Sequence, residues 1–577
     1  MRFFDTHLAP PGRKASAPEL VAGSAVLDTA HVGDIVGALG TIRQDEQRPP
    51  RSLRQRLRLL LVIMGPGLVV MIGDNDAGGV STYAQAGQNY GTKLLWTLAL
   101  LVPVLYLNQE MVVRLGAVSG VGHARLIIER FGRFWGAFSV ADLFILNGLT
   151  IITEFIGVSL ALSYFGVSKT IGVPLAALLL LGVAAGGAFR RYERAMLLLI
   201  VPVNVAVLAL FFLAHPHGGT IAHDAFVPSF PGGLNSTLLL LITAIVGTTV
   251  APWQLFFQQS NVVDKRITPR FIPYERADTA IGVALVIAGA VVLMCAAAFG
   301  LHDTPVGGHF VDAGAVAHGL HNQLGSAVGA VFALMLLDLS LIGAVAVTLS
   351  TAYTFGDVMG VRHSLHWSPR QAPLFYGGYA ALIGISAAIV LIPHAPLGII
   401  TTGVQALAGI LLPSATVFLL LLCNDRAVLG PWVNSTPRNL FAAAVVWVLV
   451  LLSLALTAAT LFSNISSRTL VLGFAIGFGV GLTALAGALV QQLLRRRRGD
   501  RVDTGRRDPW LARRLPRNGC RTALAAERAA WRMPPLRTLE RPHFSRSRIT
   551  GLLILRSYLL IALLLAIVKI VQLAIVG

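Results

Sequence analysis

The stretch MIGDNDAGGV, residues 71–80, places two aspartates, an asparagine and a pair of glycines inside a hydrophobic run that begins near Leu59. A second stretch, GTTVAPWQ at residues 247–254, interrupts another hydrophobic run, and its Pro252 has no backbone N–H to donate inside a helix. Unwound backbone at membrane depth is tolerated only where it is buried in protein or lines a polar cavity. The two stretches therefore predict two broken membrane helices with a polar interior between them.

The composition around these breaks is typical of a polytopic, all-α membrane protein. Of the 577 residues, 55% are hydrophobic and only 13% are charged, which is more apolar surface than a soluble chain of this size could bury. Runs of about 20 apolar residues, each long enough to cross the hydrocarbon core, recur along the chain. We predict about twelve core spans, near residues 59–87, 93–113, 135–165, 170–188, 194–214, 236–260, 278–300, 324–356, 373–393, 396–422, 439–462 and 468–494.

Apart from Lys93, Lys169 and Arg468, basic residues fall in alternate loops, which is the pattern of the positive-inside rule. The loops expected inside carry Arg125, Arg130, Arg133, Arg190, Arg191, Arg194, Lys265, Arg266, Arg270, Arg362, Arg370, Arg426 and Arg438. The loops at 215–235 and 301–322, expected outside, contain no Lys or Arg. We therefore expect a multi-pass protein of the cell membrane with its N-terminus in the cytoplasm.

The sequence divides into four segments. Residues 1–50 are polar and predict a disordered cytoplasmic extension ahead of a transmembrane core at 51–494. Seventeen arginines crowd into 495–548, so the segment 495–549 is expected on the cytoplasmic side, where arginines can contact anionic lipid headgroups. No nucleic-acid recognition motif accompanies this charge, so nucleic acid is not an expected partner. Residues 550–577 predict an additional hydrophobic helix, either a thirteenth span or an in-plane amphipathic helix; the sequence does not indicate an oligomeric state.

The two breaks occupy the first and sixth predicted spans, which are corresponding positions of two five-helix halves. This pattern is typical of an inverted-repeat (5+5) transporter with its site between the halves. Neither break contains Lys or Arg, so a metal ion or a proton is the expected partner of the buried carboxylates. The candidate ligands all offer oxygen: the side chains of Asp74, Asn75, Asp76 and Gln254 and the carbonyls near Thr248 and Ala251. Such ligands suit hard ions such as Mg²⁺, Ca²⁺ and Mn²⁺.

Further motifs surround the breaks: MGPG (64–67), STYAQAGQNYGTKLLW (81–96), QEMVVRLGAVSG (109–120), TEFIGVSLAL (153–162) and VQALAGILLPSA (404–415). Together with the breaks they closely resemble the NRAMP family of divalent-metal transporters. The resemblance covers residues 59 to about 494. It implies a LeuT-like fold that binds a divalent metal between the first and sixth spans and releases it by alternating access. The metal is then the substrate, and no resident cofactor is expected.

The resemblance also implies a set of metal-site positions. The family's helix-1 motif, Asp-Pro-Gly-Asn, falls on residues 76–79, so Asp76 is retained while Gly79 replaces the asparagine ligand. Its helix-6 motif, Met-Pro-His-Asn, falls on residues 251–254, where Ala251 replaces the methionine ligand. The helix-10 glutamine corresponds to Gln405. Asp74 and Thr248 are added from the breaks themselves. The expected metal positions are therefore Asp74, Asp76, Gly79, Thr248, Ala251, Gln254 and Gln405. The helix breaks lie at Gly78 and Pro252.

These departures from the family pattern indicate which metal is carried. A thioether favours transition metals, so alanine at position 251 removes a soft ligand and its selectivity against Mg²⁺. Losing two ligand side chains also widens the cavity, and Mg²⁺ tends to keep several of its waters. The sequence therefore resembles the NRAMP-related magnesium-transporter branch, whose members can also carry Mn²⁺.

Proton coupling is not expected. The family's proton route uses an aspartate and a glutamate on helix 3 and histidines on helix 6; here Ile151 replaces the aspartate and Glu154 remains. Trp253 and Gln258 replace the histidines, so no imidazole is left to titrate there.

The alternatives are an H⁺-coupled Mn²⁺/Fe²⁺ symporter and an amino-acid/cation symporter of the same fold. An enzyme is not expected, because the sequence has no HExxH motif, paired-aspartate protease signature or nucleophile elbow.

Two further acids lie inside predicted spans. Asp142 in span three and Asp338 in span eight are candidates for a direct role, because intramembrane ionisable residues are often functional; hydrogen bonding between helices is the alternative. Glu110 and Arg114, four residues apart at a helix end, predict a structural pair.

Overall fold

The computed structural model describes residues 26–44, 52–392, 397–461, 466–497 and 531–539, with the single residues 528, 553, 557 and 560. The helices are α1 (Leu53–Ile63), α2 (Pro66–Asp74), α3 (Ala77–Tyr90), α4 (Leu95–Ser119), α5 (His123–Phe131), α6 (Arg133–Tyr164), α7 (Lys169–Ala184), α8 (Phe189–Leu213), α9 (Gly218–Phe226), α10 (Ser236–Thr249), α11 (Pro252–Asp264), α12 (Ile272–Ala297), α13 (Ala313–Leu324), α14 (Ser326–Met359), α15 (Pro373–Val390), α16 (Leu397–Cys423), α17 (Arg426–Leu429), α18 (Thr436–Leu461) and α19 (Ser467–Arg497). Two short strands, β1 (Ile35–Gly37) and β2 (Gly40–Ile42), form an antiparallel hairpin in which Val36 pairs with Thr41.

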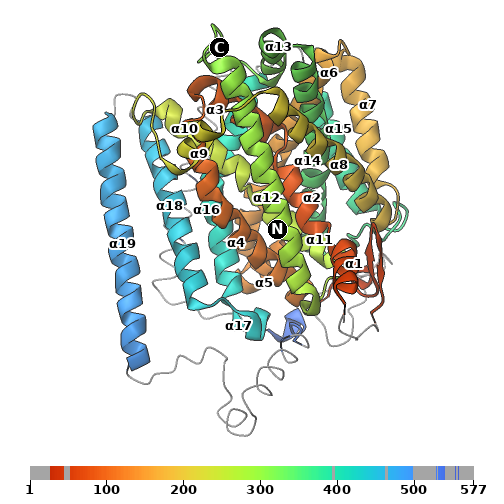
Figure 1. Cartoon of the computed structure of the whole chain (residues 1–577). Coiled ribbons are helices and arrows are strands. Elements are labelled where there is room, and N and C mark those ends of the chain that lie inside the picture. The colour runs from red at the N-terminus through yellow and green to blue at the C-terminus, as the bar shows by residue number, and fades with distance from the viewer. Residues whose placement is uncertain are drawn as a thin grey trace.

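The long helices gather into one bundle, with α19 at its edge beside α18 (Figure 1). Helices α6 and α14 pack along each other, α10 packs on α16, and α12 packs on α2 and α3. The hairpin, α1, α5 and α17 lie at one end of the bundle, and α13 lies at the opposite end. We call the first of these the basic end, because α6 begins there at Arg133 and α8 begins close to Arg190. The core of the bundle surrounds the two broken helices, so the polar residues of the breaks lie deep inside the protein.

Among the described residues, ten helices are long and apolar enough to cross a membrane, with an eleventh if the bent pair α1–α2 forms one span. In this count α10 and α11 form a single broken span. The predicted number of about twelve is higher because α7, with 16 residues, is apolar but short. At 1.5 Å per residue, α7 extends for only about 24 Å of a hydrocarbon core about 30 Å thick. The prediction of a polytopic helical membrane protein is confirmed.

The first predicted span contains a second bend that its apolar pattern did not predict. Helices α1 and α2 meet at an angle of 55°. The bend lies at Gly65, whose φ of 154° favours glycine, and Pro66 then opens α2 at a position where a missing N–H costs little. The half-helix α2, which carries Asp74 at its far end, therefore begins at a sharp corner.

Buried charges hold this corner in place. The backbone N–H groups of Gly65 and Gly67 donate to the carboxylate of Asp278 on α12, at 3.2 and 2.7 Å. An acidic group at a helix N-terminus is stabilised by the free N–H groups and by the helix dipole. Lys265 donates to the two carbonyls just before the bend and pairs with Glu193 of α8. The start of α2 is thus tied to α8, α11 and α12.

Residues 26–44, which we call the N-terminal strap, differ from the predicted disordered extension of residues 1–50. The strap forms a 3₁₀ turn at Thr29–His31 followed by the hairpin, and it lies at the basic end of the bundle. Arginines from two distant parts of the chain donate to its carbonyls: Arg190 to Gly37 and Gly40, Arg194 to Ala38, and Arg266 to Ala30 and Asp34. The part of the extension outside the strap lies outside the described residues.

The predicted arginine-rich segment 495–549 and the predicted helix at 550–577 also lie mostly outside the described residues. Within residues 531–539, Met533 is buried, and its N–H donates to the carbonyl of Val118 on α4 at 3.3 Å. This short piece therefore packs against the basic end of the bundle.

Titratable groups join the strap to the loop after α14. The carboxylate of Asp28 accepts a hydrogen bond from the backbone N–H of His363 at 3.2 Å. The ring of His31 packs edge-on against that of His363, and its Nε2 lies 3.6 Å from a carboxylate oxygen of Asp264. His363 in turn pairs with Asp357 at 3.2 Å. Both histidines are buried, so a change in the charge of either ring alters how firmly the strap is docked.

The pKa shifts of these groups predict a pH window for docking. Burial lowers the pKa of His31, so its contribution to docking is present above the ordinary histidine pKa of about 6.5 and is lost as the pH falls. Burial also acts to lower the pKa of His363, but hydrogen bonding to Asp357 outweighs it and raises that pKa to about 9. The contribution of His363 is therefore complete below about pH 6.5 and is lost as the pH rises through about 9.

We expect hydrogen-exchange protection factors in the strap to be greatest near neutral pH and to decrease on both sides. His363→Gln should lower the protection at neutral pH and remove the alkaline decrease. His309→Gln, an exposed histidine outside the cluster, should change neither. Protection that stays constant between mildly acidic pH and pH values above 9 in the wild-type protein would contradict this coupling.

Candidate metal site

The two helix breaks face each other inside the bundle. Helix α2 ends at Asp74 and α3 begins at Ala77, while α10 ends at Thr249 and α11 begins at Pro252. Each unwound segment separates two half-helices, as the sequence predicted. Carbonyls at the C-terminal end of a helix carry partial negative charge and attract cations. The C-terminal ends of α2 and α10 therefore favour a positive ion, while the N-terminal ends of α3 and α11 favour acidic side chains beside it.

A relay of two glutamine side chains holds Asp74. The Gln254 amide of α11 donates to one carboxylate oxygen of Asp74, and Gln109 of α4 donates to the Gln254 oxygen at 2.8 Å. Gln254 was predicted to offer its oxygen to the ion, but in the structure that oxygen accepts from Gln109, and the N–H group faces the acid. Gln254 thus orients Asp74 and leaves the other carboxylate oxygen, Oδ2, buried without a hydrogen-bond partner. Gln109 was not among the predicted site residues, although it opens the motif at 109–120.

The first turn of α3 gathers a second pair of acids. Asp76 caps this helix, because its carboxylate accepts from the N–H of Gly79 at 2.8 Å. Glu154 of α6 accepts from the N–H of Ala77 at 3.1 Å, which places its carboxyl group close to Asp76. Helix α14 approaches closely at Gly343, where a Cβ would lie 2.8 Å from both Asp76 and Glu154. The positive end of α3 and the absence of a side chain at Gly343 together accommodate the two acids.

Several buried polar atoms around the breaks have no hydrogen-bond partner. They are Oδ2 of Asp74, Oε1 of Glu154, Oγ1 of Thr248 and Nε2 of Gln405. Nearly all buried polar groups in proteins are paired, so a cluster of unpaired ones indicates a place for an ion or ordered water. A Cβ on Gly78 would overlap Nε2 of Gln405, and a Cβ on Gly79 would lie 3.2 Å from Oγ1 of Thr248. The structure thus brings Asp74, Gly78, Gly79, Thr248 and Gln405 together.

Ala251 and Asn75 occupy the unwound segments themselves. Ala251 is buried directly before Pro252, at the start of α11, and offers only a methyl group and its carbonyl. Asn75 was considered a ligand from the sequence, but its amide donates to the carbonyl of Val286 on α12 at 2.9 Å. It therefore points away from the opposing break and joins α12 to the first one.

Trp253, Gln258 and Ile151, which replace the family's proton-route residues, are buried and make uncharged contacts. The carbonyl of Trp253 accepts from the hydroxyl of Ser350 at 3.0 Å, and the amide of Gln258 donates to Thr279 at 3.2 Å. Ile151 is fully buried on α6. Across the described ranges, no group of three or more His, Cys, Asp or Glu side chains is arranged to hold a metal ion. The donors at the breaks are instead a mixture of carboxylate, hydroxyl, amide and backbone carbonyl groups.

Glu110 and Arg114 form the predicted structural pair, at 3.2 Å, in a larger network. Arg276 of α12 and Arg438 of α18 also approach the Glu110 carboxylate, at 2.5 and 3.6 Å. The carboxylate thus joins three helices.

Comparison with known proteins gives one consistent family. Residues 67–459, more than half of the chain, match the family described as Nramp, natural resistance-associated macrophage protein-like. The chain is 30% identical over 412 residues to the divalent metal cation transporter MntH of Ralstonia nicotianae, covering 68% of this chain and 88% of that protein. It is also 30% identical over 410 residues to the divalent metal cation transporter MntH 1 of Pseudomonas aeruginosa, covering 68% and 89%.

A solved structure has the same fold. The manganese transporter of Eremococcus coleocola superimposes with a TM-score of 0.58 at 21% identity, covering 78% of this chain and 97% of that one. The LeuT-like fold that the family resemblance implied is thereby confirmed.

Gly78→Ala tests whether Gln405 belongs to the site. The added methyl group would displace the Gln405 amide, so we expect Mn²⁺ affinity, measured by titration calorimetry on the purified protein, to fall by about tenfold, or about 1.4 kcal/mol. Gly148→Ala, at an α6 position where a Cβ meets nothing within 4 Å, should keep the wild-type affinity. Equal affinities in the two variants would exclude Gln405 from the site.

Proposed function

The chain belongs to the Nramp family of divalent metal transporters, and we propose that it carries Mg²⁺ and Mn²⁺ across the cell membrane by alternating access, without obligatory proton coupling. In this proposal the ion binds between the α2–α3 and α10–α11 breaks. The N-terminus lies in the cytoplasm, in keeping with the basic residues at that end of the bundle. Transport, not catalysis, is the function of the site.

The observation that supports this proposal most directly is the unpaired carboxylate oxygen of Asp74 beside the capped acid Asp76. A buried acid without a counter-charge is costly in a membrane, and no Lys or Arg lies in either break. A bound divalent cation would offset that cost for both carboxylates at once. The hydroxyl of Thr248 and the Gln405 amide, which can present its oxygen after rotation, would complete an oxygen-rich shell.

The proposed preference for Mg²⁺ rests on what the breaks lack. Ala251 offers no sulfur and Gly79 offers no side chain, so neither contributes a soft ligand or fills the space between the breaks. Mg²⁺ loses its waters reluctantly and is usually bound through one or two carboxylates with several waters retained. A site with few side-chain ligands and room for water suits that ion. In this proposal the chain is a member of the NRAMP-related magnesium-transporter branch.

The proposed lack of proton coupling rests on Ile151, Trp253 and Gln258, which cannot carry a proton at neutral pH. The alternative, an H⁺-coupled Mn²⁺ symporter, is favoured by one observation: Glu154 is retained and lies close to Asp76 at the first turn of α3. An amino-acid symporter is less compatible with this site, because a substrate carboxylate would meet the acids of the first break.

Asp76→Ala tests the assigned site. Mn²⁺ and Mg²⁺ uptake into proteoliposomes should fall to the level of empty liposomes, because the variant loses both an ion ligand and the cap of α3. Asp303→Ala, an exposed acid in the loop after α12, is the matched control and should transport normally. Normal uptake by a folded, membrane-inserted Asp76→Ala protein would refute the assignment.

Ala251→Met tests the proposed selectivity. A methionine at this position restores a soft ligand and fills space that water would occupy, and both effects act against Mg²⁺. The ratio of Mn²⁺ to Mg²⁺ uptake should therefore rise by about tenfold, equivalent to about 1.4 kcal/mol, even if both rates fall. Ala141→Met, at an exposed position on α6, should leave the ratio unchanged. An unchanged ratio in an active Ala251→Met protein would show that residue 251 does not set selectivity.

A further inference from the structure

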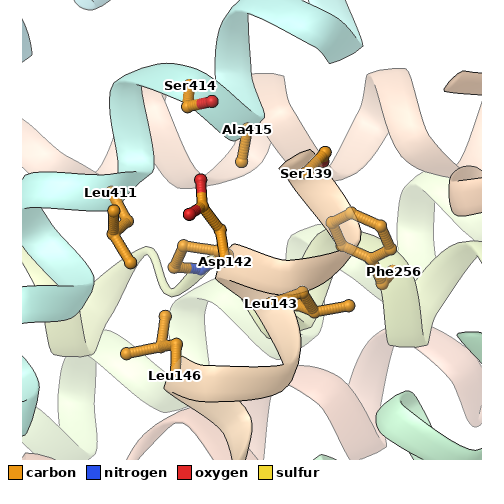
Figure 2. Close-up of a pocket in the computed structure, with 9 residues that line it drawn as sticks. Ser139, Asp142, Leu143, Leu146, Phe256, Leu411, Ser414 and Ala415 are labelled. Carbon is orange, nitrogen blue, oxygen red and sulfur yellow. The ribbon is translucent and has the colours of Figure 1, made fainter. Parts of the chain in front are cut away.

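A small pocket lies beside the second break, on its α11 side. It is enclosed by α6, α11 and α16, and Pro252, the first residue of α11, forms part of its wall. Figure 2 shows the carboxylate of Asp142 extending from α6 toward Ser414 and Ala415 of α16. The pocket leaves about 20 Å³ for the centres of water molecules, which is room for an ordered water or a small ion.

Asp142 is the charged group in this pocket, and it lacks a partner. The side chain is half-buried, and its Oδ2 is buried without a hydrogen-bond partner among the described residues. The rest of the lining is apolar except for two hydroxyl groups, those of Ser139 and Ser414. An acid in such surroundings is costly unless it is protonated or meets a cation.

The position of Asp142 along α6 relates it to the breaks. It lies twelve residues before Glu154, which corresponds to about 18 Å along the helix axis. It lies nine residues after Arg133, which corresponds to about 14 Å. The pocket is therefore between the broken-helix site and the basic end of the bundle. Because Pro252 directly follows Ala251, the pocket shares one wall with the metal site.

We propose that Asp142 is the anchor of a second binding station for the transported divalent cation, between the broken-helix site and the basic end of the bundle. The inference rests on the proposed transport function. Ser139 and Asp142 are three residues apart and share one face of α6, and Ser414 faces them from α16. One carboxylate, two hydroxyls and retained water form an oxygen set that suits Mg²⁺ or Mn²⁺.

A station of this kind has a physical role in transport. An ion leaving Asp74 and Asp76 for the basic end must cross apolar side chains, and an intermediate negative charge lowers the cost of that passage. A single carboxylate binds more weakly than the acids at the breaks, so the ion can leave again; conduction through successive sites requires this balance. Asp142 thus influences how fast the ion is released and has little effect on how it is first bound.

The first test compares Asp142→Asn with Asp338→Asn in the full-length protein in proteoliposomes. Asp338 on α14 is a suitable control, because its Oδ1 is also buried and unpaired but it does not line this pocket. Asp142→Asn should lower kcat for Mn²⁺ uptake by about tenfold while KM changes by less than about twofold, and Asp338→Asn should change neither. A wild-type kcat in Asp142→Asn would overturn the proposal. A loss of the pH dependence of uptake at unchanged kcat would overturn it in favour of a proton-carrying role.

The second test measures binding and does not depend on transport. Purified Asp76→Ala protein, titrated with Mn²⁺ alone, should retain one weak site, and adding Asp142→Asn should remove it. Asp142→Glu, which keeps the charge, should retain the site and also controls for misfolding of the asparagine variant. Residual binding that survives Asp142→Asn, or no residual binding in a folded Asp76→Ala protein, would overturn the second station. If the wild-type protein carries no divalent ion, the proposed function fails, and this titration still decides whether Asp142 binds one.

Discussion

Two aspartates at the end of a broken membrane helix impose the constraint on which the rest of this structure depends. Asp74 and Asp76 need either hydrogen-bond donors or a cation, because both carboxylates are buried inside a membrane protein. The protein supplies part of the requirement itself: an amide from Gln254 and a backbone N–H from Gly79. One oxygen of Asp74 remains unpaired, and in the proposed function a divalent cation would meet this requirement.

The surrounding helices are shaped by that requirement. Glycines allow close approach where an acid or amide must fit: Gly343 of α14 lies against Asp76 and Glu154, and Gly78 lies against Gln405. At the other end of α2, Asp278 and Lys265 hold the corner from α12 and from the end of α11. The half-helix is thus fixed at its start, and in the proposed function its other end, at Asp74, binds the ion. In the proposed function, α2 therefore connects the ion site at Asp74 to α8, α11 and α12.

The breaks could be predicted from the sequence, because acids, paired glycines and proline seldom occur together inside an apolar run unless the helix is broken there. Gly79, Ala251 and Gln405 were named as site positions only through the family resemblance. Contacts between distant parts of the chain could not be predicted. Gln109 was missed because it contacts Asp74 only indirectly, through Gln254. Asn75 faces α12, because the path of the unwound segment determines where its side chain points. The folded strap was missed for a similar reason: its short strands are held by arginines such as Arg190 and Arg266, far along the chain. The pocket at Asp142 depends on three helices whose packing no local pattern reveals.

The central claim is that an oxygen-lined site between two broken helices carries a hydrated divalent ion without a proton. It is tested most directly by measuring Mg²⁺ entry and internal pH together in proteoliposomes that contain the full-length protein. An inward Mg²⁺ gradient should drive Mg²⁺ entry, excess Mg²⁺ should compete with Mn²⁺, and the internal pH should follow that of empty liposomes. Metal-dependent acidification, or Mn²⁺ uptake that excess Mg²⁺ does not reduce, would contradict the claim.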